Sequence, residues 1–422
     1  MAKDRGHSAP RGALVLGSDY KALGIARSLG RHGIPVWILR DDHLLASCSR
    51  YCTRSLAWTA TTDDERVTDL LGLGARYALD GWALFPTDDE TAALLSRNRR
   101  ALSTRFVITT PKWEVLRWAY DKRLTYRLAA GLGVDHPRTH YPQSGGELAG
   151  LEIAYPAILK PALRAEENRF TMAKAWRADD RVSLLAKYDE ATRLVDPSLI
   201  MVQELIPGGG GCQLSYAALC RDGRPIASVV ARRTRQWPMD FGRASTYVET
   251  IDDPEVEASA TRILAVLGYS GIVEVEFKRD PRDGRLKLLD INPRVWGWHS
   301  VGRRAGVDFP YLLWRMLSDE PLPRLRGRTG VRWVRALTDV PTVLGEIRAR
   351  RLSLGAYLRS LRGPIEFAIF APDDPLPALV ELPASCALAW RRRMRRAGGA
   401  AAPASVGETA TTPLASGRGA SQ

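Results

Sequence analysis

One hairpin constrains this chain more than any other feature. Residues 271–278 read GIVEVEFK and residues 285–292 read RLKLLDIN, with an Asp283–Gly284 turn signal between them. Antiparallel pairing about Asp283 places residue 276 opposite residue 290 and residue 274 opposite residue 292. Because side chains alternate along a strand, one face then carries the polar groups Glu274, Glu276, Asp290 and Asn292. The other face carries the apolar groups Val273, Val275, Phe277, Leu289 and Ile291.

The polar face of this hairpin needs compensation for its charge. Like charges on paired strands destabilise a sheet, and a buried carboxylate is costly unless it is paired or coordinated. A hard cation would meet both needs, and oxygen ligands without His or Cys favour Mg²⁺ or Mn²⁺, usually together with phosphates. The alternative is an exposed acidic face neutralised by nearby Lys and Arg. The hairpin alone leaves both interpretations open.

Length and charge limit the class of protein. With 422 residues, 45% of them hydrophobic, the chain should form two or three domains. The sequence lacks an apolar window long enough for a membrane span and a signal-peptide core at its start, so we expect a cytoplasmic protein. Five cysteines cannot build a disulfide framework in a chain of this length, which predicts reduced thiols.

The net charge of +14 is concentrated near the C-terminus. Residues 324–422 hold 16 Arg against 7 Asp plus Glu, a net charge of +9, and residues 390–399 read WRRRMRRAGG. Such a run could touch phosphates or anionic lipid, but neither aromatic RNA-binding strands nor zinc-finger spacing accompany it. We interpret it as a solvated basic segment and expect no nucleic-acid partner.

The order of predicted elements divides the chain into four parts. Residues 12–18, a helical stretch after them and residues 34–40 form a β-α-β start, which predicts a Rossmann-like domain over 1–110. Its first turn reads GSDYKALG rather than the dinucleotide fingerprint, so NAD binding is unsupported. A helix carrying Asp121 and Lys122 opens an α+β domain over 111–323. Residues 324–396 form a C-terminal appendage and residues 397–422 a disordered tail.

Five motifs in order resemble the ATP-grasp superfamily, in its carboxylate–amine ligase branch near carbamoyl-phosphate synthase. They are YDK at 120–122, AILKP at 157–161, MVQELIPG at 201–208, EVEF at 274–277 and LLDINPR at 288–294. The resemblance implies a pre-ATP-grasp domain, an ATP-grasp fold of α/β and α+β character and a C-terminal appendage. It also implies ATP as co-substrate, with two Mg²⁺ or Mn²⁺ ions.

The same resemblance implies roles for individual residues. Lys122 and Lys160 would reach the ATP phosphates, and Lys174 would face the nucleotide. The hinge Gln203, Glu204, Leu205 and Ile206 would line adenine, with Val202 and Ile206 on its two faces and Gln213 at the ribose. Glu276, Asp290 and Asn292 would be the metal ligands. Arg294 would steady the transferred phosphate or the substrate carboxylate, because a guanidinium binds either in a bidentate manner.

Two further segments are candidates for the substrate end. Three arginines would suit anionic groups, and two tryptophans with a histidine would suit an apolar or ring-bearing portion; the residues are Arg232, Arg233, Arg235, Trp296, Trp298 and His299. The alternative is that the tryptophans belong to the core.

The resemblance predicts an ATP-dependent ligase that activates a small-molecule carboxylate as an acyl phosphate and joins it to an amine, releasing ADP and phosphate. A homodimer is a further expectation, because dimers are common in the superfamily. Bicarbonate chemistry through carboxyphosphate is an alternative within the same class of enzyme. A non-catalytic nucleotide-binding or nucleic-acid-binding module is an alternative from another class.

Overall fold

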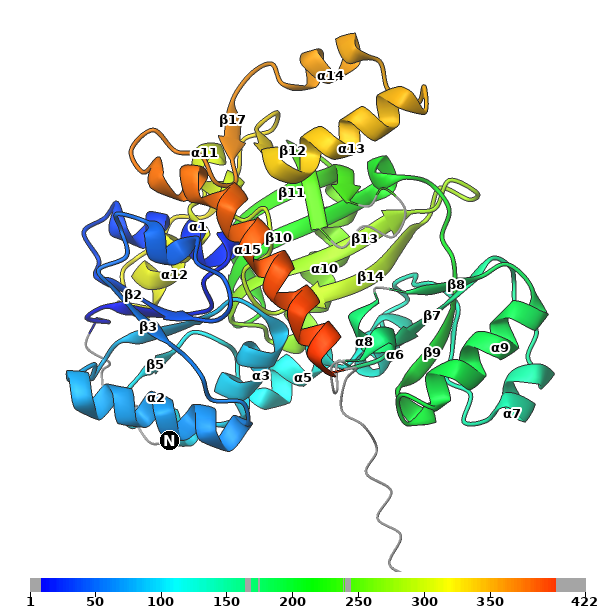
Figure 1. Cartoon of the computed structure of the whole chain (residues 1–422), viewed down its shortest axis with the longest axis horizontal. Coiled ribbons are helices and arrows are strands. Elements are labelled where there is room, and N and C mark those ends of the chain that lie inside the picture. Colours follow the sequence, from blue (N-terminus) through cyan, green and yellow to red (C-terminus); the bar gives the residue numbers. More distant parts are fainter. Residues whose placement is uncertain (1–8, 164–167, 174, 238, 240–243, 400–422) are drawn as a thin grey trace, which may run out of the picture.

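The computed structural model describes residues 9–163, 168–173, 175–237, 239 and 244–399. Its strands form three sheets (Figure 1). Among these residues, helices long and apolar enough to cross a membrane are absent.

The first sheet is parallel and has the strand order β3-β2-β1-β4-β5. Its strands are β1 (Ala13–Leu16), β2 (Val36–Arg40), β3 (Arg54–Ala57), β4 (Ala83–Pro86) and β5 (Val107–Ile108). The accompanying helices are α1 (Tyr20–Gly30), η1 (Ala46–Cys48), α2 (Asp63–Tyr77), α3 (Asp89–Arg97) and α4 (Arg99–Leu102). Val15 faces the core cluster that contains α1 residues, and Leu14 faces the cluster that contains Leu70 of α2. Helices on both faces explain why the strands read as continuous apolar runs, as predicted for a doubly wound sheet.

The second sheet has four antiparallel strands in the order β6-β9-β7-β8. They are β6 (Thr139–His140), β7 (Ala157–Pro161), β8 (Trp176–Ala178) and β9 (Ile200–Glu204). The helices nearby in sequence are α5 (Trp113–Tyr120), α6 (Lys122–Gly131), α7 (Gly145–Gly150), α8 (Arg169–Met172), α9 (Arg181–Thr192) and η2 (Pro197–Leu199). Leu184 and Tyr188 of α9 pack in one cluster with Leu159 and Val202, so α9 covers one face and leaves the other to a neighbouring part of the protein.

The third sheet has eight strands along the order β14-β13-β10-β11-β12-β16-β17, with β15 paired to β11. They are β10 (Gln213–Arg221), β11 (Arg224–Trp237), β12 (Ala244–Ile251), β13 (Gly271–Arg279), β14 (Leu286–Asn292), β15 (Leu325–Arg326), β16 (Arg332–Val334) and β17 (Ile365–Phe367). The remaining helices are η3 (Gly210–Cys212), α10 (Pro254–Leu267), α11 (Val301–Ala305), α12 (Phe309–Leu317), α13 (Ala336–Arg348), α14 (Leu354–Ser360) and α15 (Leu376–Gly399).

Both faces of the eight-stranded sheet contact helices. Val273 and Val275 face the cluster that holds Ile263 of α10, whereas Ile272 faces the cluster shared with α1 and α12. The mixed α/β and α+β fold class is therefore confirmed. The segment predicted as an appendage supplies β15, β16 and β17 to this sheet, and the predicted domain boundaries stay predictions.

Candidate functional site

A cavity of about 980 Å³ lies between the four-stranded and the eight-stranded sheets. It is large enough for a nucleotide together with a small substrate. Twelve of the residues predicted for the site line it: Lys122, Lys160, Gln203, Glu204, Leu205, Ile206, Gln213, Arg233, Glu276, Asp290, Asn292 and Arg294. The fold thus brings motifs spread over 173 residues, from 122 to 294, to one place.

The β13–β14 hairpin has the predicted register at the site. Glu274 lies opposite Asn292 and Glu276 opposite Asp290. A bulge after Glu276 shifts the pairing closer to the turn. As a result Leu289, expected in the core, lines the cavity, and Leu288 takes the core position instead.

The amide of Asn292 is held in one orientation by two carboxylates. Its Nδ2 donates to Glu274 Oε2 at 3.0 Å and to Glu276 Oε1 at 2.9 Å. Glu276 is paired with Arg233 and accepts as an ionised carboxylate, so the amide nitrogen of Asn292 must face it and the amide oxygen must face away. Asn292 Oδ1 accepts from Arg294 Nη2 at 3.0 Å, on the cavity side. This is the orientation that a metal-ligating asparagine requires.

Two of the three carboxylates at this site are paired with cations. Arg233 Nη1 lies 2.6 Å from Glu276 Oε2, and Lys122 forms an ion pair with Asp290. Glu274 is 2% exposed, and burial together with the neighbouring Glu276 charge raises its pKa to about 8. Cations therefore offset the charge of Glu276 and Asp290, whereas Glu274 favours the neutral form.

The donor set fits magnesium bound through a nucleotide. Across the described part of the chain, clusters of three or more His, Cys, Asp and Glu side chains suited to a metal are absent. The predicted ligand oxygens belong instead to two carboxylates and one amide, those of Glu276, Asp290 and Asn292. Mg²⁺ is commonly held by one or two carboxylates with substrate phosphates completing its shell, so this set suits Mg²⁺ better than a metal that needs an all-protein cage.

Two lysines line the cavity from neighbouring elements, α6 and β7. A single helix was predicted around Asp121, but the chain breaks there: Asp121 is extended and caps α6 by accepting from the Arg123 N–H at 2.9 Å. The break places Lys122 in the first turn of α6. Burial opposes its charge, but Asp290 prevails and raises its pKa. Burial and the like charge of Lys122 lower the pKa of Lys160 on β7 to about 7.

The segment after β9 lines the cavity near apolar side chains. The N–H groups of Glu204 and Leu205 donate to the carbonyls of Arg138 and Pro156. Ile158 and Leu289 line the cavity, whereas Val202, predicted to contact adenine, is fully buried in the cluster beneath α9. Alternation places Val202 on the opposite face of β9 from the cavity.

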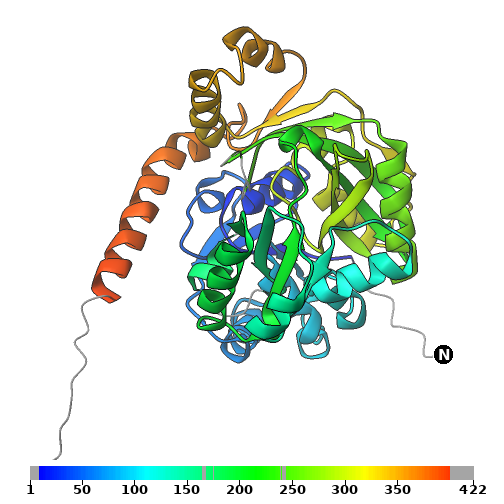
Figure 2. The ribbon, with the colours of Figure 1, turned by 90° about the vertical axis from the view of Figure 1, so that its right-hand side faces the viewer.

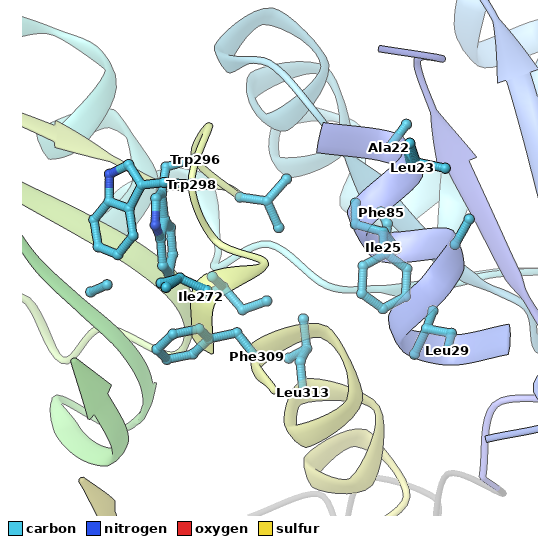
Figure 3. Packing of buried hydrophobic residues seen from close by; sticks show 14 of the residues in the cluster. Ala22, Leu23, Ile25, Leu29, Phe85, Ile272, Trp296, Trp298, Phe309 and Leu313 are labelled. Carbon is cyan, nitrogen blue, oxygen red and sulfur yellow. The ribbon is translucent and has the colours of Figure 1, made fainter. Parts of the chain in front are cut away.

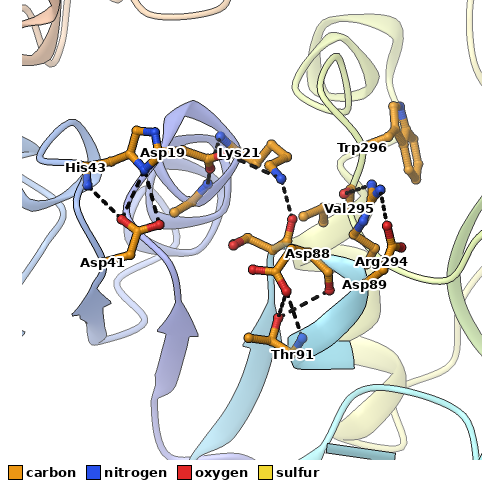
Figure 4. Close-up of polar contacts among 12 residues, drawn as sticks. Asp19, Lys21, Asp41, His43, Asp88, Asp89, Thr91, Arg294, Val295 and Trp296 are labelled. Carbon is orange, nitrogen blue, oxygen red and sulfur yellow. Dashed lines mark hydrogen bonds and ion pairs between the residues drawn. The ribbon is translucent and has the colours of Figure 1, made fainter. Parts of the chain in front are cut away.

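Several polar residues in the lining were not singled out as site residues, among them Lys278 and Asp89. Lys278 continues the alternation of Glu274 and Glu276, and its Nζ donates to Ile206 O at 2.9 Å. Asp89 follows β4 and reaches Arg294 Nη2 at 2.9 Å (Figure 4). The period of two on β13 could have identified Lys278.

The contact between Asp89 and Arg294 lies at the carboxyl ends of β1 and β4. These strands flank the point where the parallel sheet changes direction, the place where doubly wound folds bind ligands. Burial opposes ionisation of Asp89, but the guanidinium of Arg294 prevails and lowers the pKa of Asp89. The first sheet therefore contributes directly to the cavity, through the turn that follows β4.

The predicted substrate role of Trp296, Trp298 and His299 is corrected by the structure. Both tryptophans are at most 2% exposed and belong to the core cluster that also holds residues of α1 and α12, with the Trp296 ring packed on Phe309 (Figure 3). The chain turns beneath the sheet after Asn292, so these side chains lie outside the cavity lining. Burial lowers the pKa of His299 to about 4, which keeps the ring neutral.

Trp298 still acts on the site through a contact. Its Nε1 donates to Glu274 Oε1 at 2.9 Å, while Glu274 Oε2 accepts from Asn292. The indole thus fixes the carboxylate that orients the asparagine.

Two of the three arginines predicted at the substrate end lie elsewhere. Arg232 is exposed on the other face of β11. Arg235 is buried with Asp339, to which its Nε and Nη2 donate at 2.8 Å. Because side chains alternate along β11, Arg232 and Arg233 point to opposite faces of the sheet. A register irregularity between Arg232 and Arg235 places Arg235 away from the cavity as well. Lys174, predicted to face the nucleotide, lies outside the described residues.

Comparisons with known proteins agree with this geometry. The family described as "ATP-grasp in the biosynthetic pathway with Ter operon" matches residues 198–339. D-alanine–D-alanine ligase B of Xanthomonas campestris pv. campestris is 27% identical over 221 residues, which are 47% of this chain and 64% of that ligase. D-aspartate ligase of Enterococcus faecium is 22% identical over 302 residues, 67% of this chain and 70% of that one.

A solved structure shares the fold. The biotin carboxylase domain dimer of Hydrogenobacter thermophilus 2-oxoglutarate carboxylase, in complex with MgADP and bicarbonate, is 15% identical with a TM-score of 0.61. The match covers 77% of this chain and 74% of that one. The family match, the two ligases and the shared fold confirm the resemblance of the five motifs. The chain is thus similar in sequence to ATP-grasp carboxylate–amine ligases, and it shares the ATP-grasp fold.

Proposed function

We propose that this protein is an ATP-dependent ligase that joins a small-molecule carboxylate to an amine. One observation carries the proposal: the cavity gathers two lysines, an arginine, two carboxylates and an oriented asparagine on one nucleotide-sized space. Such a set of side chains is suited to bind a polyanion together with its metal cations. Phosphoryl transfer is catalysed mainly by positioning and by stabilisation of charge, which these groups can supply. The similarity to two amino-acid ligases supports carbon–nitrogen bond formation.

The proposed reaction has two steps. A carboxylate oxygen of the substrate attacks the γ-phosphorus of ATP, and the bond to the β-phosphate oxygen breaks to release ADP. The amine nitrogen then attacks the acyl carbon, phosphate leaves, and the nitrogen loses a proton to solvent or buffer. Magnesium, when bound, would neutralise charge on the phosphate oxygens. Lys122 and Lys160 would hold the phosphates, and Arg294 would lie beside the group in transfer.

The edge of the cavity nearest the first sheet suits the amine. Asp89 and Glu90 line it, and Arg294 lies between this acidic edge and Asn292. An ammonium group on the amine substrate would contact carboxylates there. The carboxylate of the other substrate would face the guanidinium of Arg294. We propose Asp89 as a contact of the amine substrate. We also propose a homodimer, supported by the dimer of the Hydrogenobacter domain.

The test is phosphate release with ATP and Mg²⁺ across pools of carboxylates and amines, with products identified by mass spectrometry. Asn292→Ala should abolish stimulated turnover, because the oriented oxygen is lost. Asn98→Ala removes an asparagine at the end of α3, outside the cavity lining, and should leave turnover intact. The proposal fails if every pool leaves ATP turnover at background, or if Asn292→Ala keeps the activity of the unaltered protein.

Two additional arms separate the alternatives. Bicarbonate alone stimulating ATP turnover, without a covalent amide product, would favour carboxyphosphate chemistry. Nucleotide binding with no turnover in any pool would favour a binding module. The retained set of Glu276, Asp290, Asn292 and Arg294 argues against the second, since binding alone does not need metal-ligand geometry.

A further inference from the structure

The helix α15 (Leu376–Gly399) is fixed to the protein at its base. Asp374, whose side chain is 1% exposed, accepts from Arg27 Nε at 2.9 Å and from Ser49 Oγ at 2.7 Å. Asp373 accepts two hydrogen bonds from Arg31, at 2.8 and 2.9 Å. A buried, multiply hydrogen-bonded carboxylate is costly to displace. The direction in which α15 leaves α1 and η1 is therefore set by the fold.

One side of the first turns of α15 faces the protein. Ala378 packs against the core cluster, and Glu381, which is 9% exposed, pairs with Arg335 at 3.5 Å. Beyond these turns the helix continues away from the sheets: it crosses the front of the molecule in Figure 1 and stands clear of the other ribbons in Figure 2. The C-terminal half of α15 is thus presented on a rigid base.

The outer side of α15 carries an apolar stripe. Leu379, Leu382, Trp390 and Met394 are 74%, 59%, 63% and 54% exposed, and Cys386 between them is also exposed. At 3.6 residues per turn these five positions fall within an arc of about 120°. Single exposed apolar residues are common, but an ordered stripe on a projecting helix is typical of a contact surface.

Strong positive charge lies next to the stripe in the sequence. Residues 390–396 read WRRRMRR, and the helix from Leu382 to Gly399 contains five arginines without an acidic residue. Apolar and aromatic residues on one side of a basic helix are the signature of a helix that lies in the plane of a membrane interface. Each basic residue near an anionic leaflet adds attraction, and tryptophan favours the headgroup level.

We propose that α15 is a docking surface for an anionic lipid bilayer, with Leu379, Leu382, Trp390 and Met394 entering the headgroup region. A nucleic acid would pair with the arginines but would leave the leucines in water. A second copy of this chain could cover the apolar stripe, but a parallel pairing of two α15 helices would bring two runs of five arginines together. A bilayer with acidic headgroups satisfies both features at once. The proposal is independent of the ligase activity.

The test is co-sedimentation of the full-length protein with vesicles of phosphatidylcholine alone and of phosphatidylcholine mixed with phosphatidylglycerol. We expect binding to the mixed vesicles that weakens as salt is raised, because attraction between surface charges is screened. The double variant Trp390→Glu, Met394→Glu should bind at least about tenfold less, since apolar area is lost and negative charge is added. A variant with all five arginines changed to Gln should lose at least about a hundredfold.

The matched control changes exposed apolar residues on another helix. Leu354→Glu, Leu358→Glu on α14 introduces the same two charges at side chains that are 59% and 54% exposed, and it should bind vesicles like the unaltered protein. Circular dichroism and nucleotide affinity, unchanged in all variants, would exclude unfolding as the cause of any loss.

Several outcomes would overturn the proposal. One is equal binding to both kinds of vesicle, and another is full binding by the Trp390→Glu, Met394→Glu variant. Duplex DNA or RNA that binds more tightly than the vesicles would assign the helix to nucleic acid instead. A change from dimer to monomer in sedimentation velocity, caused by the stripe variant without any effect on vesicle binding, would assign it to a second copy.

Discussion

Nucleotide binding should take up a proton, because Lys160 is poised to gain charge. In the nucleotide-free protein, burial and the neighbouring charge of Lys122 lower the pKa of Lys160 to about 7 from an ordinary 10.5. Phosphates placed beside it would favour the charged form and restore a high pKa. At pH 8 the free protein then has Lys160 about nine-tenths neutral, so binding MgADP should take up about 0.9 proton.

The same linkage sets the pH dependence of affinity. If Lys160 must be charged in the complex, the association constant should fall about fivefold from pH 7 to 8 and about ninefold from pH 8 to 9. Isothermal titration calorimetry in two buffers of different ionisation enthalpy measures the uptake directly. Working above pH 7.5 keeps the nucleotide phosphates ionised, so the uptake reports the protein.

Substitution isolates the lysine. Lys160→Met should weaken nucleotide binding and abolish the proton uptake, whereas Lys187→Met on α9, outside the cavity lining, should change neither.

The pKa of Lys160 also affects the stability of the nucleotide-free protein. Between pH 7 and 10.5 Lys160 is protonated in the unfolded chain and neutral in the folded chain, so the free energy of unfolding should rise with pH. Lys160→Met should flatten that rise. Uptake that persists in Lys160→Met, or its absence in the unaltered protein, would refute the reasoning.

Two further predictions concern the residues behind the cavity. Trp298→Phe removes the donor that holds Glu274, so the amide of Asn292 should lose its fixed orientation; we expect Mn²⁺ affinity of the ADP complex, measured by electron paramagnetic resonance, to fall about 10-fold or more while metal-free ADP binds as before. Unchanged Mn²⁺ affinity would show that the asparagine is oriented by other contacts. Gly24→Ala would place a Cβ 2.5 Å from His299 Nε2, and the crowding should lower the free energy of unfolding by about 1–3 kcal/mol in a denaturant titration. A loss below the error of that titration would contradict the close packing of α1 on this turn.

Local periodicity was enough to predict the polar face of the hairpin. Glu276 meets Asp290 as the alternation of side chains and the Asp283–Gly284 turn required. Leu289 was misplaced, because a bulge adds one residue to a strand without leaving a mark in the pattern of apolar and polar letters. The alternation of side chains over a few residues therefore predicts which face a residue occupies, but it does not reveal where a bulge interrupts that alternation.

The substrate role of the tryptophans failed for a different reason. An aromatic residue that follows a site motif can line a ligand cavity or pack in the core. The residue type alone does not distinguish these two positions. Trp298 became a support for Glu274 because α12 and α1 close over the turn that follows Asn292, burying the indole while its N–H finds a carboxylate.

The sequence by itself determined the order of the motifs, the chemistry of the polar face and the resemblance to the ATP-grasp superfamily, because each depends on residue types within short segments. Only the tertiary structure decided which groups complete the cavity. Arg294 meets Asp89 across 205 positions of chain, and α15 leaves the protein along a line set by Asp374 and Arg27, 347 positions apart. Such contacts depend on how separate sheets and helices pack together, which short-range periodicity does not encode.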